Sequence, residues 1–133
     1  MKREIRHCID PEDAVKLAQM PGLETTILKG LGGERMMMVL NATLPGHKVP
    51  VHSYPNEQIG VVYSGRAFWR IGDEEHLAEQ GDSYCIAIDV PRGDRSIGDE
   101  PFVMLDIFHP VRADLIEKLL QVGKGENQQG GSG

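Results

Sequence analysis

The histidines are the side chains of this sequence best suited to metal binding or acid–base chemistry. One of them, His52, has a second reactive residue, Tyr54, two positions further along. In a strand, residues two apart project from the same face, so both side chains are expected to share one environment. If this face lines an interior, His52 can act as an acid or base near neutral pH. The alternative is a hydrogen-bonded interior histidine beside an interior tyrosine. The others are His7, His47, His76 and His109.

A lone carboxylate, Asp106, interrupts the apolar segment 102–108. Period-2 alternation in a strand places it on the same face as Phe102, Met104 and Phe108. Burying a carboxylate costs free energy unless the group is paired or functional. Asp106 is therefore a second candidate for proton transfer. The alternatives are a position at a sheet edge or a structural ion pair.

The segments that carry these residues have the punctuation of short strands. Sixteen glycines and eight prolines make 24 of 133 residues, about 18%, against roughly 12% in average proteins. Apolar runs such as 58–63, 67–71 and 102–108 end at Gly- or Pro-containing turns. Several short strands separated by such turns predict an all-β sandwich or barrel.

Two helices are expected to flank the strands. Asp10-Pro11 resembles a helix start, and Pro21-Gly22 would end a short N-terminal helix. Residues 113–121 have the apolar spacing of a C-terminal helix. We expect one domain over residues 1–122, followed by a flexible polar tail or linker over 123–133.

The charge balance excludes some classes of partner. Fourteen Lys and Arg against twenty Asp and Glu give a net charge of −6, which disfavours nucleic acid and anionic membrane as ligands. No apolar stretch is long enough to span a membrane, and no signal-peptide core opens the chain. We therefore expect a cytoplasmic protein.

Two sets of residues between Gly46 and Ser96 have a regular spacing. The first set is Gly46, His52, Tyr54, Gln58 and Gly65, and the second is Gly81, Ala87, Asp89, Arg92 and Ser96. This pattern resembles the two motifs of the cupin superfamily of small jelly-roll β-barrels, Gly-x5-His-x-His-x3,4-Glu-x6-Gly and Gly-x5-Pro-x-Gly-x2-His-x3-Asn. The spacing of both motifs is kept, although several residue types differ.

The resemblance implies a metal site at four positions, which His52, Tyr54, Gln58 and Arg92 occupy here. Cupins typically use three histidines and one Glu or Gln. An unperturbed tyrosine, with a pKa near ~10, is a poor ligand, and arginine has no lone pair to offer. We therefore expect no metal and no other cofactor. If a divalent metal binds, its ligands would be His52, Gln58 and Tyr54, with His47 or His109 as further candidates.

Arg92 suggests what replaces the metal. Projecting inward, as the family histidine does, its guanidinium would place a fixed positive charge that suits a carboxylate. The alternative is a turn arginine that points to solvent.

A second resemblance concerns the last strand. The pattern of Asp106, Phe108 and Arg112, taken with residues 52–60, is similar to the pectin-degradation cupins, which convert unsaturated uronic acids to linear keto forms. In that subgroup, the residues at these three positions line the site. The resemblance implies a small anionic, sugar-acid-like substrate.

Three functions follow as hypotheses. The first is a metal-independent isomerase or lyase in which His52 and Asp106 move protons and Tyr54 donates a hydrogen bond. In it, Arg92 and Arg112 hold the substrate anion, with Phe108 and Gln58 beside them. The second is a cupin that binds a ligand without catalysis, and the third is a metal-dependent oxygenase or isomerase. The resemblance also implies a homodimer.

Overall fold

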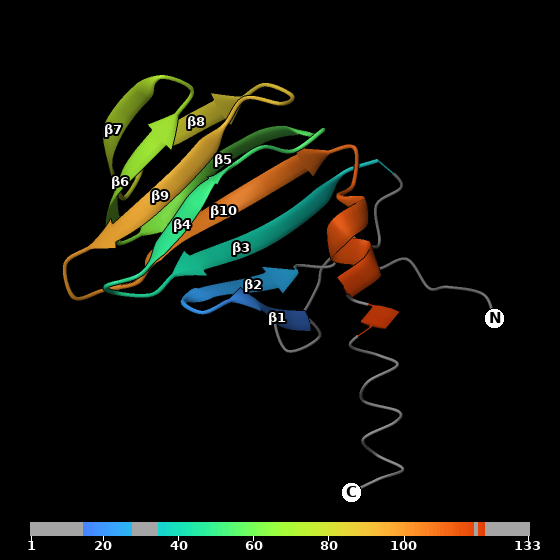
Figure 1. The fold of residues 1–133 in the computed structure, drawn as a ribbon, viewed down its shortest axis with the longest axis horizontal. Coiled ribbons are helices and arrows are strands. Elements are labelled where there is room, and N and C mark those ends of the chain that lie inside the picture. Colours follow the sequence, from blue (N-terminus) through green and yellow to red (C-terminus); the bar gives the residue numbers. More distant parts are fainter. Residues whose placement is uncertain (1–14, 28–34, 119, 122–133) are drawn as a thin grey trace, which may run out of the picture.

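The computed structural model describes residues 15–27, 35–118 and 120–121. These residues form strands and one short helix at the C-terminal end, over 113–118 and 120–121 (Figure 1). The strands are β1 (Val15–Met20), β2 (Leu23–Ile27), β3 (Met37–Thr43), β4 (Lys48–His52), β5 (Glu57–Ser64), β6 (Arg66–Ile71), β7 (Glu74–Glu79), β8 (Ser83–Ile86), β9 (Arg92–Ile97) and β10 (Phe102–His109).

The strands make two antiparallel sheets that face each other across the core. The first sheet has the order β1-β2-β3-β10-β5-β8, and the second has the order β4-β9-β6-β7. This arrangement confirms the predicted all-β fold. No helix in the described part of the chain is both long and apolar enough to cross a membrane.

Strand β10 lies in the middle of the larger sheet, between β3 and β5. Its burial alternates as predicted: Phe102, Met104, Asp106 and Phe108 are buried, while the residues between them are half-buried. Asp106 stands opposite Val39 on β3 and Gly60 on β5. The carboxylate is thus at the centre of a sheet, not at an edge.

The core has two apolar clusters. One surrounds Trp69 and Phe102, and the other surrounds Phe108 and Leu115 of the C-terminal helix. The predicted helix over 113–121 is therefore confirmed for its described residues, and Leu115 packs it onto the sheets. Leu120, near the end of this segment, is exposed.

The predicted N-terminal helix is wrong over its described residues. Val15–Met20 is strand β1, which pairs with β2 around a turn at Pro21-Gly22. Gly22 has φ +82, and a Cβ there would overlap the His47 ring. Pairing with β2 satisfies the backbone and directs Leu17 into the core, which outweighs the weak helix propensity of a short segment. Residues 1–14 and the predicted tail over 123–133 lie outside the described residues.

Candidate functional site

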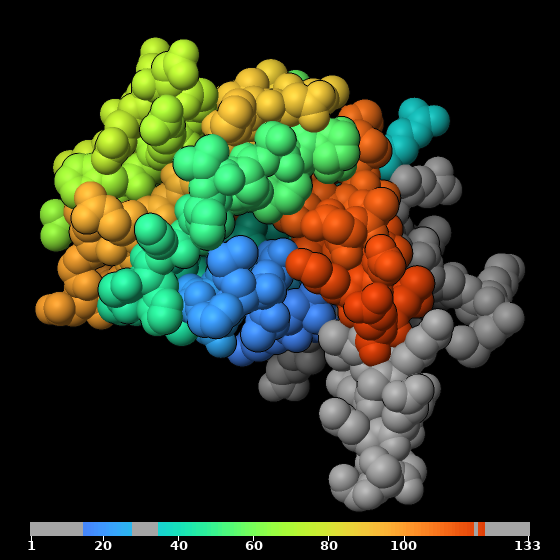
Figure 2. Space-filling view, in the orientation of Figure 1, coloured from blue at the N-terminus to red at the C-terminus, as the bar shows by residue number. Residues whose placement is uncertain are grey.

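A small cavity lies between the two sheets. In Figure 2 the surface is hollowed between the blue residues of β1 and β2 and the green residues of β4 and the segment after it, with teal residues of β3 deeper inside. The cavity volume of about 30 Å³ is room for two or three water molecules, at roughly 10–15 Å³ for each. Its polar or aromatic lining residues are Gln19, Asn41, His52, Tyr54, Gln58, Trp69, Arg92, Asp94, Asp106 and Phe108.

Most of the residues predicted from the sequence therefore meet in one place, although they come from distant parts of the chain. His52, Tyr54, Gln58, Arg92, Asp106 and Phe108 all line the cavity. Arg112 is not part of the lining, and neither are His47 and His109, the further metal-ligand candidates.

Asp106 is fully buried and accepts three hydrogen bonds. Asn41 Nδ2 donates to Oδ2 at 2.7 Å, Gln58 Nε2 donates to Oδ1 at 2.8 Å, and the Tyr84 hydroxyl also donates to Oδ1. Burial raises the pKa of Asp106, while these three donors and the charge of Arg112 act in the opposite direction. Hydrogen bonds from these donors stabilise the charged form of the carboxylate and oppose the effect of burial.

Arg92 points into the protein, contrary to the alternative of a solvent-facing turn arginine. It is 2% exposed and belongs to β9. Its Nε and Nη2 donate to the carbonyl oxygen of Val90, and Nη2 also reaches that of Ala87. Its Nη1 donates to Oε1 of Gln58 at 2.5 Å. A guanidinium has five N–H groups, and among the residues that the structure describes the second N–H on Nη1 has no acceptor, so it can meet a ligand.

His52 is half-buried at the end of β4. Its Nδ1 lies 2.7 Å from the carbonyl oxygen of Pro50. Because a carbonyl can only accept, Nδ1 carries the proton, and Nε2 of the neutral ring is the nitrogen that can take one up. Burial lowers the pKa of His52, and the charges of Arg92 and Arg112 lower it further. The ring is therefore neutral at physiological pH.

Tyr54 stands between the cavity and Arg112. Its ring lies edge-on to His52 and to Phe108, with centroids 4.7 Å and 5.8 Å away. The Arg112 guanidinium is 3.9 Å from the Tyr54 centroid and makes a two-bond ion pair with Asp114, with distances of 3.1 Å and 2.6 Å. Burial raises the pKa of Tyr54, so its hydroxyl stays protonated and can donate. The Arg112 guanidinium thus packs against the Tyr54 ring and helps to fix its position.

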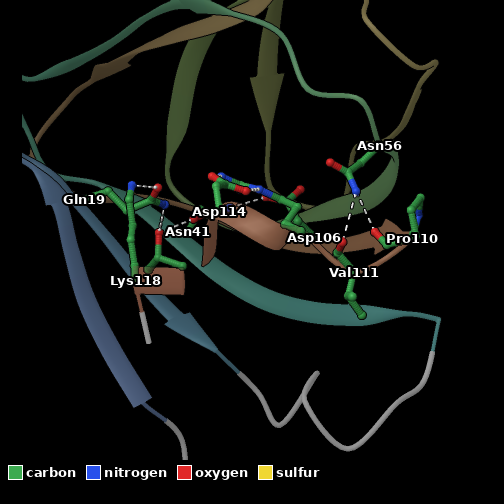
Figure 3. Close-up of polar contacts among 10 residues, drawn as sticks. Gln19, Asn41, Asn56, Asp106, Pro110, Val111, Asp114 and Lys118 are labelled. Carbon is green, nitrogen blue, oxygen red and sulfur yellow. Dashed lines mark hydrogen bonds and ion pairs between the residues drawn. The ribbon is translucent and has the colours of Figure 1, made fainter. Parts of the chain in front are cut away.

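A chain of hydrogen bonds joins the C-terminal helix to Asp106. Lys118 donates to Gln19, which donates to Thr25 at 2.5 Å; Thr25 in turn donates to Asn41 Oδ1 at 2.6 Å. Figure 3 shows Lys118 and Gln19 at one end of this chain and Asp106 at the other. Because lysine can only donate, every link runs toward the carboxylate. Figure 3 also shows Asn56 holding the carbonyl oxygen of Pro110, through a 2.7 Å bond, where the chain leaves β10.

The four positions that hold a metal in cupins do not fit one here. The Gln58 oxygen that would face a cation already accepts from Arg92, and the guanidinium would repel a dication. Tyr54 is held in its protonated form. Within residues 15–27, 35–118 and 120–121, no three His, Cys, Asp or Glu side chains group closely enough to hold a metal ion.

Several polar residues of this region were not identified from the sequence, among them four that bind the two buried carboxyl groups or supply one. Asn41 and Tyr84 bind Asp106, Thr43 and Asp94 bind each other across the two sheets at 2.7 Å, and Asp94 also lines the cavity. Asp94 stands two residues after Arg92 on a strand, so period-2 alternation was a usable signal for it. Nothing local in the sequence links Asn41 or Tyr84 to Asp106.

Comparison with known proteins agrees with this geometry. Residues 42–108 match the family model described as Cupin domain. An RmlC-like cupin from Shewanella frigidimarina NCIMB 400 superposes with a TM-score of 0.72 and 21% identity, over 83% of this chain and 96% of that chain. KdgF from Halomonas sp. superposes with a TM-score of 0.71 and 19% identity, over 80% of this chain and 96% of that chain. No curated protein is significantly similar in sequence.

Proposed function

The chain belongs to the cupin family, and we propose that it binds a small carboxylate-bearing molecule at Arg92 and catalyses a proton-transfer isomerisation, ring opening or lyase step without a metal. The observation that carries the proposal is the Arg92 guanidinium, buried in the cavity at a position where the family keeps a metal ligand. The similarity of Asp106, Phe108 and Arg112 to the uronate-converting subgroup favours a sugar acid.

The fixed cation gives the site its preference for an anion. The backbone carbonyl oxygens of Val90 and Ala87 and the side chain of Gln58 hold the guanidinium in one orientation. A ligand carboxylate can meet the remaining N–H of Arg92 without any reorganisation of the protein, and this pre-organisation favours binding. The cavity, with a volume of about 30 Å³, would hold the carboxylate and the atoms next to it, and the rest of a sugar acid would lie outside.

The proton transfer would use the two aromatic residues at the cavity wall. In this proposal, His52 Nε2 removes a proton from the carbon beside the carboxylate or a neighbouring carbonyl group. Negative charge then develops on oxygen, where the hydroxyl of Tyr54 stabilises it by donating a hydrogen bond. His52 returns the proton at a second carbon or to a leaving group. Asp106, which accepts hydrogen bonds from three side chains, would hold Gln58 in place for Arg92.

Solvent deuterium exchange tests this reaction without knowledge of the natural substrate. Uronates and smaller 2-hydroxy and 2-keto acids would be incubated with the protein in D₂O and followed by proton NMR. We expect loss of the signal from hydrogen on the carbon beside the carboxylate or keto group. His52→Gln should abolish the exchange and keep ligand binding, whereas Arg92→Gln should abolish both. Equal exchange by wild type and His52→Gln would overturn the assignment of the base.

Binding without catalysis is a second candidate function. It is favoured by the setting of Asp106, one of the two predicted proton carriers, which is fully buried and bound by three side-chain donors. The same experiment separates the two functions. Ligand-induced shifts in the NMR spectrum of the protein without any deuterium exchange would favour a binding protein. If no acid binds at all, both candidates fail.

A further inference from the structure

Asp94 is a second carboxyl group in the cavity, and it has no role in the chemistry described above. It follows Arg92 by two residues on β9, and both side chains line the same cavity. Positions two apart in a strand are about 6.6 Å apart along it. The cation and this carboxyl group are therefore neighbours on one wall, placed to contact two groups of one small ligand.

The carboxyl group of Asp94 is only partly satisfied by the protein. Oδ1 accepts a hydrogen bond from Thr43 at 2.7 Å. Among the described residues, no side chain donates to Oδ2, and no Lys, Arg or His forms an ion pair with Asp94. The residue is 7% exposed. A carboxyl oxygen that lines a cavity without a partner is available to a ligand.

Asp94 is also a costly side chain to bury in its charged form. Burial raises its pKa to about 6, and the negative charge of Asp106 acts in the same direction. Its neighbours on the flanking strands are the buried Val49 and Trp69, so an apolar side chain would suit the position better. A buried carboxyl group that forms no ion pair with any residue the structure describes is typical of a functional position.

We propose that Asp94 is a specificity-determining residue that hydrogen-bonds a hydroxyl group of the ligand, so that the site selects hydroxy acids over simple carboxylic acids. The inference rests on the proposed function, because the ligand carboxylate must first be held by Arg92. A hydroxyl on the second or third carbon lies close enough to the carboxylate for both groups to enter together. Since a hydroxyl both donates and accepts, it pairs with Asp94 in either protonation state.

The experiment compares acids that differ only in a hydroxyl group. Lactate and 3-hydroxypropionate would be titrated against propionate by isothermal calorimetry or NMR. We expect the wild-type protein to bind at least one hydroxy acid about tenfold to a hundredfold more tightly than propionate, as suits a hydrogen bond to a charged group. The informative variant is Thr43→Val with Asp94→Val, which removes both partners of a buried hydrogen bond and avoids leaving one unsatisfied. Thr43→Val alone is the matched control and should keep the preference.

The outcomes separate this inference from the proposed function. If the double variant binds all three acids with the affinity of propionate, Asp94 determines the preference. If the double variant keeps the hydroxyl preference, or if the wild-type protein binds all three acids equally, the role of Asp94 is wrong while anion binding stands. If none of these acids nor any uronate binds the wild-type protein, the proposed function itself fails.

Discussion

Arg92 and Gln58 are joined by a hydrogen bond of 2.5 Å from guanidinium Nη1 to amide Oε1. Both residues stand at positions that carry metal ligands in cupins. The bond turns the Gln58 oxygen toward a cation supplied by the chain itself and turns its Nε2 toward Asp106. The positive charge of the Arg92 side chain thus occupies the region where the family places a metal ion.

Replacing Arg92 should therefore change the affinity for metal. In Arg92→His, the repulsive charge is lost, the Gln58 oxygen is released, and a second imidazole joins His52. We expect the variant to bind Zn²⁺ at least tenfold more tightly than the wild type, measured by calorimetry and by elemental analysis of protein purified without chelator. Arg92→Gln is the control, since it removes the charge without adding a ligand. Stoichiometric metal in the wild type that disappears in His52→Ala would show instead that the native site binds metal.

Asp94→Asn should stabilise the protein in a pH-dependent manner. The pKa of Asp94 is about 6 in the folded protein and 3.8 as an ordinary carboxyl group. A carboxyl group whose pKa is raised by folding stabilises the fold below the lower value, and this contribution is lost as the pH rises through the higher one. The difference corresponds to about 3 kcal/mol at 1.36 kcal/mol per pH unit. Urea denaturation should find Asp94→Asn more stable than wild type by up to about 3 kcal/mol at pH 8, and similar to it near pH 4. An equal difference at both pH values would contradict this assignment.

Tyr84→Phe should destabilise the protein through Asp106. The change preserves the ring packed at 4.2 Å from Trp69 and removes only the hydroxyl that donates to the carboxylate. Losing a hydrogen bond to a buried charged group costs about 1–3 kcal/mol. Tyr63→Phe is the matched control, because Tyr63 is 63% exposed and should be neutral. Equal stability of the two variants in denaturant titrations would mean that the Tyr84 hydroxyl contributes nothing.

Arg112→Met should be more damaging than Arg95→Met. Both guanidinium groups lie over an aromatic ring, that of Arg112 over Tyr54 and that of Arg95 over Phe68. Arg112 is buried and also pairs with Asp114, whereas Arg95 is exposed. We expect a loss of about 1–3 kcal/mol for Arg112→Met, and no more than about 0.5 kcal/mol for Arg95→Met. A comparable loss in both variants would argue against a supporting role specific to Arg112.

The pH dependence of deuterium exchange should report the state of His52. Because burial lowers the pKa of this residue below its usual 6.5, the basic form persists into mildly acid solution. The exchange rate should therefore stay level from pH 8 down to 6.5 and fall only below that. An exchange rate that already decreases between pH 8 and pH 6.5 would indicate a different base. Tyr54→Phe should lower the rate at every pH and leave the midpoint unchanged.

The sequence by itself determined which side chains share one face of each predicted strand. Alternation in 102–108 identified the buried face of β10, and the spacing of the motif residues brought His52, Gln58 and Arg92 to one cavity. These features are visible in sequence because alternation and turn chemistry depend on residues close in the chain. The same local reasoning failed for 15–20, where a weak helical signal was overruled by pairing with β2.

Only the tertiary structure decided what each side chain meets. The three donors to Asp106 come from β3, β5 and β8, and Thr43 reaches Asp94 from the opposite sheet. Arg112, expected in the cavity, instead stacks behind Tyr54 and pairs with Asp114. Such contacts depend on the register of strands far apart in the chain and on the packing of two sheets. No local pattern encodes either, and for that reason the network around Asp106 and the single hydrogen bond of the Asp94 carboxyl group emerged only from the fold.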